Sequence, residues 1–157
     1  MFTTTLILIV STGLLLFYFQ AVCERILRRP FAQEFYQSIV NANGLEYPSI
    51  RKALEEFDGP VEYARLKVTL RCDFLILKYL LKNATNVRQR YTCEERLLIL
   101  YFRIWFVSLV TRHILRWREN AAAIKLTAIL HYFANIVGER VNRVRFGDMT
   151  TSDFFNI

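Results

Sequence analysis

The chain begins with a long run of hydrophobic and uncharged polar positions. Residues Thr3 to Val22 give 20 positions without a charged side chain, and the first charge is Glu24. An α-helix rises about 1.5 Å per residue, so this run can just cross a hydrocarbon core of about 30 Å. Tyr18 and Phe19 lie near its C-terminal end, where aromatic rings favour the membrane interface. The pattern predicts an N-terminal transmembrane helix.

Basic residues follow this segment at once, and none precedes it. Arg25, Arg28 and Arg29 are the first three. Because Lys and Arg prefer the cytoplasmic side, we expect the N-terminus outside and the C-terminal domain in the cytoplasm. A cleaved signal peptide is the rival interpretation. It requires a basic region before the hydrophobic run, which is missing here, and Ala21-Val22-Cys23 resembles a cleavage site poorly.

Beyond residue 29, hydrophobic positions recur at helical spacing, and no stretch of alternating polarity competes with it. Asn43-Gly44 is a typical helix stop, Ser49 can cap a short helix, and Thr92 with Glu95 has the spacing of a capping box. The expected helices cover residues 31–42, 49–57, 60–83, 92–118 and 120–145.

These elements define the expected fold class and domains. We predict an all-α protein, with a single transmembrane helix followed by a small bundle of three longer or medium helices and two short ones. Residues 1–29 form the anchor and its basic flank, residues 30–145 the bundle, and residues 146–157 a tail without clear periodicity.

The 60–83 helix carries two hydrophobic stripes on roughly opposite sides. One contains Leu66, Leu70 and Leu77, and the other contains Val68, Cys72, Leu75 and Tyr79. A helix with two hydrophobic faces can pack between two neighbours, so we expect it to be the central helix.

The 92–118 helix is hydrophobic from Leu97 to Val110 except for Arg103. This run is shorter than the 18 or more residues typical of a membrane span. A central arginine also costs about 2.5–3.5 kcal/mol on insertion scales. We therefore favour a core helix, and a helix lying in the membrane surface is the intermediate alternative.

Composition and charge narrow the possible functions. Hydrophobic residues make up 54% of the 157 positions, which excludes a disordered chain. The formal net charge is +7. Residues 65–118 hold 12 Lys or Arg against Asp73, Glu94 and Glu95, so the excess belongs to the two central helices.

Four of these basic residues form a strip on the 60–83 helix, namely Lys67, Arg71, Lys78 and Lys82. The strip is a candidate binding surface for anionic lipid or for an acidic partner, and an ordinary solvated face is the alternative. Nucleic acid is disfavoured, because no zinc-finger, basic-zipper or RNP-type motif accompanies the charges.

Candidates for chemistry are few. His113 and His131 lie on different helices, and the three cysteines lack metal-ligand spacing, so no metal or cofactor is expected. Asp73 and Arg103 stand among hydrophobic residues. Since a buried charge needs a partner, we expect them to form an interhelical ion pair, or a polar pocket that includes His131.

Further polar residues line one side of the 120–145 helix. These are Thr127, His131, Asn135 and Asn142. We interpret this side as the solvent-facing face of an amphipathic helix. A polar site with His131 as acid or base is the alternative.

No catalytic constellation is visible beside the large hydrophobic area. We therefore expect a membrane-anchored, non-enzymatic interaction or assembly subunit that binds anionic membrane or an acidic partner, with a protein partner or self-association. The alternative is a small membrane-associated enzyme, or a binder of an apolar or lipid-like ligand, with Asp73, Arg103 and His131 in its pocket.

Overall fold

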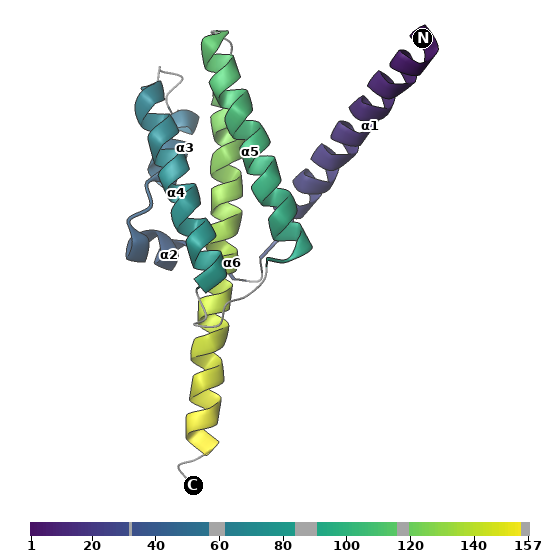
Figure 1. The fold of residues 1–157 in the computed structure, drawn as a ribbon. Coiled ribbons are helices and arrows are strands. Elements are labelled where there is room, and N and C mark those ends of the chain that lie inside the picture. Colours follow the sequence, from purple (N-terminus) through teal and green to yellow (C-terminus); the bar gives the residue numbers. More distant parts are fainter. Residues whose placement is uncertain (32, 57–61, 84–90, 116–119, 155–157) are drawn as a thin grey trace.

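The computed structural model describes residues 1–31, 33–56, 62–83, 91–115 and 120–154, with only the backbone from residue 145 onwards. Every regular element in these ranges is an α-helix (Figure 1), so the prediction of an all-α protein is confirmed. The helices are α1 (Phe2–Leu27), α2 (Tyr36–Asn43), α3 (Tyr47–Glu56), α4 (Tyr63–Asn83), α5 (Cys93–Ile114) and α6 (Asn120–Phe154).

Two of the predicted helix boundaries are confirmed in detail. Gly44 ends α2 with φ of 62°, a left-handed conformation that glycine adopts without steric cost. At the start of α5, the Glu95 amide donates to Thr92 Oγ1 at 3.3 Å, and the Thr92 amide donates to Glu95 Oε2 at 3.1 Å. This is the capping box that the sequence predicted.

The starts of α2 and α3 differ from the prediction because side chains of other helices cap them. Asn135 Oδ1 of α6 accepts from the amides of Phe35 and Tyr36, so α2 begins at Tyr36 and not at residue 31. Asp73 of α4 supplies the acceptor for the first turn of α3, which begins before Ser49. Such long-range caps leave no signal in the local sequence.

The central helix is α6, and the expectation that the 60–83 helix is central was wrong. Helix α6 packs against α2, α3, α4 and α5, and against the base of α1. Ala122, Ala123 and Ala134 are fully buried, and their small side chains let neighbouring backbones approach. The helix also continues to Phe154, past its expected end near residue 145.

The second hydrophobic stripe of α4 explains the error. Val68, Leu75 and Tyr79 are 53–67% exposed, whereas Leu66, Leu70 and Leu77 on the opposite side are buried. Two stripes therefore do not mean two packed faces in this helix. The exposed stripe is left available on the surface of the bundle.

Helix α1 projects away from the bundle (Figure 1) and is hydrophobic along almost its whole length. Among the described residues, three helices are long and apolar enough to cross a membrane: α1, α5 and the 120–144 part of α6. Only 6% of the most hydrophobic window of α1 is buried within the protein, against 22% for α5 and 67% for α6. The N-terminal helix is thus a membrane-span candidate, as predicted.

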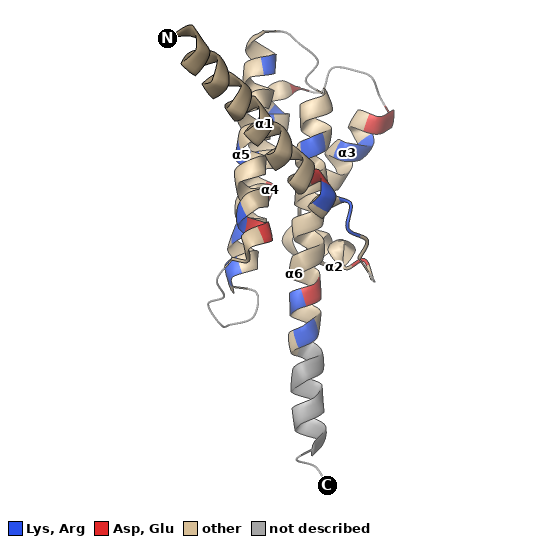
Figure 2. Cartoon of the chain, turned by 90° about the vertical axis from the view of Figure 1, so that its right-hand side faces the viewer, with Lys and Arg blue, Asp and Glu red and all other residues tan. Residues whose placement is uncertain are grey.

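The base of α1 is held to the bundle by polar and aromatic contacts. Lys125 Nζ of α6 lies 2.7 Å from the Glu24 carboxylate, and Arg29 lies 3.3 Å from Glu94 of α5. The Phe19 ring meets Tyr101 edge-on, with centroids 6.0 Å apart. In Figure 2 the outer part of α1 carries no charge, and charged residues begin where it joins the bundle.

Candidate membrane interface

Helices α4 and α5 lie side by side and turn one common surface outward. The rings of Phe74 and Phe102 stack between them with centroids 3.9 Å apart. We call the surface on the other side of these two helices the outer face. It consists of Lys67, Val68, Arg71, Cys72, Leu75, Lys78, Tyr79 and Lys82 of α4, with Arg96, Leu100, Arg103, Ile104 and Val107 of α5.

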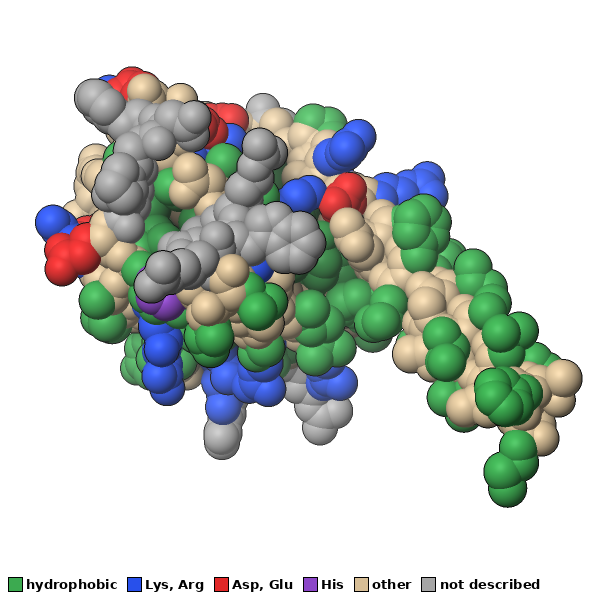
Figure 3. Space-filling view, turned by 90° about the horizontal axis from the view of Figure 1, so that it is seen from above, with side chains coloured by type: hydrophobic (Ala, Val, Ile, Leu, Met, Phe, Trp, Pro, Cys, Tyr) green, Lys and Arg blue, Asp and Glu red, His purple; other side chains and the backbone are tan. Residues whose placement is uncertain are grey.

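The outer face combines exposed hydrophobic side chains with basic ones. Arg71, Arg96 and Arg103 are exposed, and Lys67, Lys78 and Lys82 are half-buried. Its large hydrophobic residues, Tyr79 included, are 43–67% exposed. In the view from above (Figure 3), Lys and Arg side chains stand beside hydrophobic ones along the edge formed by α4 and α5. A surface of this composition fits the headgroup region of a membrane, where hydrophobic side chains enter the acyl boundary and cations meet anionic lipid.

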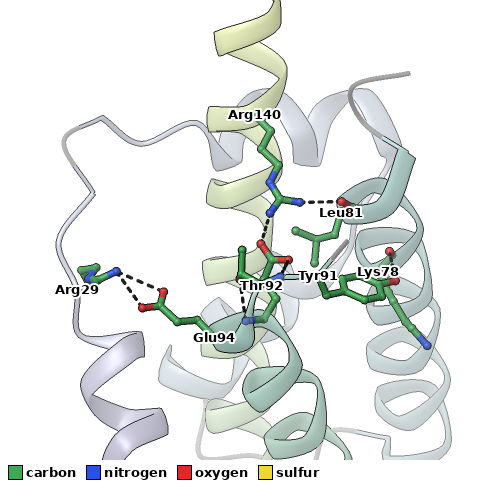
Figure 4. Close-up of polar contacts among 8 residues, drawn as sticks. Arg29, Lys78, Leu81, Tyr91, Thr92, Glu94 and Arg140 are labelled. Carbon is green, nitrogen blue, oxygen red and sulfur yellow. Dashed lines mark hydrogen bonds and ion pairs between the residues drawn. The ribbon is translucent and has the colours of Figure 1, made fainter. Parts of the chain in front are cut away.

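The acidic residues of α4 and α5 do not neutralise this face, because each is engaged elsewhere. Glu94 pairs with Arg29, and the buried carboxylate of Glu95 pairs with Arg140 of α6 (Figure 4). Arg140 also donates to the Leu81 carbonyl at 2.8 Å. Asp73 is buried. Among the described residues, no ion pair joins a basic side chain of the outer face to a carboxylate.

Asp73 and Arg103 do not form the expected ion pair. Asp73 Oδ2 accepts from the amides of Tyr47 at 2.7 Å and of Glu46 at 3.1 Å. Burial raises the pKa of the Asp73 carboxyl, and these two hydrogen bonds oppose the rise. Arg103 instead lies exposed on α5. The prediction failed because backbone N–H groups can satisfy a buried carboxylate as well as a guanidinium can.

His131 of α6 lies in an aromatic environment. Its ring centroid is 4.3 Å from that of Tyr36 and 6.5 Å from that of Tyr47, and the side chain is half-buried. Asp73 and His131 therefore both border Tyr47. Arg103 is exposed on α5.

The polar side of α6 faces inward, contrary to the solvent-facing interpretation. Thr127 is fully buried and Asn135 is 1% exposed. Asn135 faces α2, whose first turn it caps. The Glu95–Arg140 pair was not predicted from the sequence, although Glu95 was already marked by its place in the capping box. No local signal marks Arg140 as its partner.

No group of three or more His, Cys, Asp or Glu residues in the described part of the chain could hold a metal ion. Comparison with protein-family models, with curated proteins and with solved structures gave no match. Helix α1 and the outer face are therefore the features of the molecule that bear on its function.

Proposed function

We propose that this protein is a single-pass, membrane-anchored docking subunit. In this proposal α1 spans the membrane, and the bundle lies in the cytoplasm with its outer face against the anionic leaflet. The protein performs no chemistry of its own. Its role is to hold the bundle, and any protein that binds the bundle, at the membrane surface. The observation that carries the proposal is the outer face, in which exposed hydrophobic residues occur together with basic residues that form no ion pair with a described carboxylate.

The packing and the charged residues of α5 and α6 support a single span. Helix α6 is the core of the bundle and carries the Lys125 and Arg140 ion pairs. Helix α5 carries Arg103 in the middle of its hydrophobic run, and a central arginine disfavours insertion. Helix α1 has no charged residue before Glu24, and its hydrophobic side chains have few neighbours within the protein.

The choice of anionic lipid over an acidic protein rests on position and composition. The base of α1, with Arg25 and Arg28, joins the bundle beside α5, so a leaflet crossed by α1 is within reach of the outer face. Each Lys or Arg near such a leaflet contributes about 1 kcal/mol. Exposed Tyr79, Leu100 and Val107 add hydrophobic burial at about 25 cal/mol per Å².

Cys72 offers a direct test, because it is an exposed cysteine of the outer face. A polarity-sensitive fluorophore is attached to Cys72 in the full-length Cys93→Ser protein, in nanodiscs of anionic or of zwitterionic lipid. We expect blue-shifted emission in the anionic discs alone. The variant Lys78→Gln/Lys82→Gln should reduce the shift, and Arg51→Gln/Lys52→Gln on α3 should not.

A second label position controls for general lipid effects. The variant Ser49→Cys, in a Cys72→Ser/Cys93→Ser background, places the fluorophore on α3, on the side of the bundle away from the outer face (Figure 2). Its emission should be the same in both kinds of disc. If emission from the fluorophore on Cys72 is the same in anionic and in zwitterionic discs, the result would contradict the proposal and favour an acidic protein as the partner.

A further inference from the structure

The seam between α1 and α5 contains two cavities of different character. The upper one, of about 230 Å³, is lined by Leu16, Phe19 and Gln20 of α1 and by Tyr101, Ile104, Trp105 and Ser108 of α5. The lower one, of about 680 Å³, includes Arg25 of α1, Arg28 directly after α1, and Leu97 of α5. Phe19 and Gln20 of α1 line the upper cavity and Val22 and Arg25 line the lower one, so an aromatic cavity and a basic cavity follow one another along this helix.

The basic end carries more positive charge than its single carboxylate, Glu94, can neutralise. Arg29 and Glu94 also line the lower cavity, but they pair with each other at 3.3 Å. Arg25 and Arg28 are exposed, and neither forms an ion pair among the described residues, although the charge of Arg28 acts on nearby Glu24. Two free guanidinium groups at one end of a cavity are suited to a phosphate.

The upper end is shaped for a hydrocarbon chain. Phe19, Tyr101 and Trp105 form a continuous set of edge-on ring contacts, with centroids 6.0 and 6.1 Å apart. A cavity of roughly 150 Å³ already holds benzene, so about 230 Å³ accommodates a chain segment.

We infer that the α1–α5 seam binds one anionic glycerophospholipid. Its phosphate lies at Arg25 and Arg28, and one acyl chain lies against Phe19 and Trp105. This inference rests on the proposed function, because the seam opens towards the acyl region only if α1 crosses the membrane. It extends that function from general attraction by the leaflet to a specific lipid site.

Trp105 provides the readout. The chain has two tryptophans, so the Trp117→Phe variant leaves Trp105 as the single fluorophore. The full-length variant is placed in zwitterionic nanodiscs that contain small amounts of phosphatidylglycerol or phosphatidylcholine with brominated acyl chains. Bromine quenches tryptophan on contact. We expect brominated phosphatidylglycerol to quench at lower concentration and to saturate at a single lipid per protein.

Two variants separate the phosphate end from the chain end. In Arg25→Gln/Arg28→Gln, the affinity for phosphatidylglycerol should fall about fivefold for each arginine removed. In Ser108→Phe, a larger side chain fills the upper cavity, and quenching by both lipids should fall. Arg51→Gln/Lys52→Gln on α3 is the control that should leave both curves unchanged.

The outcomes distinguish this inference from the proposed function. Equal quenching by the two lipids, or no quenching by either, overturns the lipid site. Retention of the protein in the disc tests the anchor, and the Cys72 emission tests the outer face. A failure of the seam with a normal Cys72 shift therefore leaves the proposed function standing.

Discussion

At the scale of single residues, Asp73 and Gly138 have roles that depend on contacts far away in the sequence. Asp73 Oδ2 accepts the amides of Glu46 and Tyr47 at the start of α3. Gly138 of α6 lies against Phe35, just before α2: a Cβ added at Gly138 would be 2.4 Å from Phe35 Cβ and 3.0 Å from its carbonyl oxygen. Both residues position the short helices on α4 and α6.

Two substitutions of Asp73 distinguish the contribution of its hydrogen bonds to stability from the contribution of its charge. In Asp73→Ala, two buried amides lose their acceptor, and we expect a loss of about 2 kcal/mol in the free energy of unfolding. In Asp73→Asn the amide oxygen can still accept and no charge is buried, so we expect no comparable loss. Urea unfolding of the full-length protein in mild detergent measures both. Equal losses in the two variants would contradict the capping role.

The Asp73 carboxyl should also make the free energy of unfolding depend on pH, and the direction of this dependence follows from its pKa. Because burial raises the pKa of Asp73 in the folded state, the folded protein binds this proton more tightly than the unfolded chain. The associated stability is complete below the ordinary aspartate pKa of about 4 and is lost as the pH rises through the higher, folded value. Unfolding free energies of wild type and Asp73→Asn, compared from pH 4 to 7, should diverge in favour of Asp73→Asn.

Gly138→Ala should destabilise the protein. Overpacking against Phe35 costs about 1–3 kcal/mol, which exceeds the roughly 1 kcal/mol that alanine gains in helix propensity. Gly13→Ala on α1 is the matched control, because a Cβ there meets nothing within 4 Å. The melting temperatures of the two variants provide the comparison. A Gly138→Ala protein as stable as Gly13→Ala would refute the close approach.

At the scale of helices, the hydrophobic pattern predicted where most elements occur but not how they pack. The capping box at Thr92 and the stop at Gly44 are local, and both could be read from the sequence. The central position of α6 could not, because the small residues that allow close packing, such as Ala122 and Ala134, give only a weak hydrophobic signal. The partners of Asp73 and Glu95 depend on chain segments 26 and 45 residues away.

The pair formed by Glu95 and Arg140 should be the strongest polar link between α5 and α6. The Glu95 side chain is 2% exposed and that of Arg140 is 17% exposed. Removing one partner of a buried pair typically costs about 3–5 kcal/mol. We therefore expect Arg140→Met to be strongly destabilising. In the double variant Glu95→Gln/Arg140→Met, the loss in the free energy of unfolding should be smaller than the sum of the losses in the two single variants.

The exposed pair of Arg143 and Glu139 on α6 is the natural comparison for this double-mutant cycle. Arg143→Met should change the free energy of unfolding by no more than about 0.5 kcal/mol, as for other exposed i,i+4 pairs. Chemical unfolding of the full-length variants in detergent gives all the required values. Similar effects of Arg140→Met and Arg143→Met would show that burial adds nothing to the inner pair.

At the scale of the whole molecule, the protein exposes hydrophobic surface in two places, and each fits a different layer of the membrane. The exposed side chains of α1 include Leu8, Leu15 and Phe17, with no charge beside them, and they fit the acyl core. Those of the outer face alternate with Lys and Arg, and they fit the headgroup layer. The sequence indicated the first surface directly. The sequence also indicated the basic strip of the second surface, but the exposure of Val68, Leu75 and Tyr79 beside it became visible only when α4 was found at the edge of the bundle.

Membrane topology is the measurement that tests this account most directly. Single-cysteine variants, Thr3→Cys, Ile114→Cys and native Cys72, are treated with a membrane-impermeant thiol reagent in intact and in permeabilised cells. We expect Thr3→Cys to react in intact cells, and Cys72 and Ile114→Cys to react only after permeabilisation. Reaction of Ile114→Cys in intact cells without reaction of Cys72 would mean that α5 crosses the membrane, and it would contradict the single span and the cytoplasmic docking face.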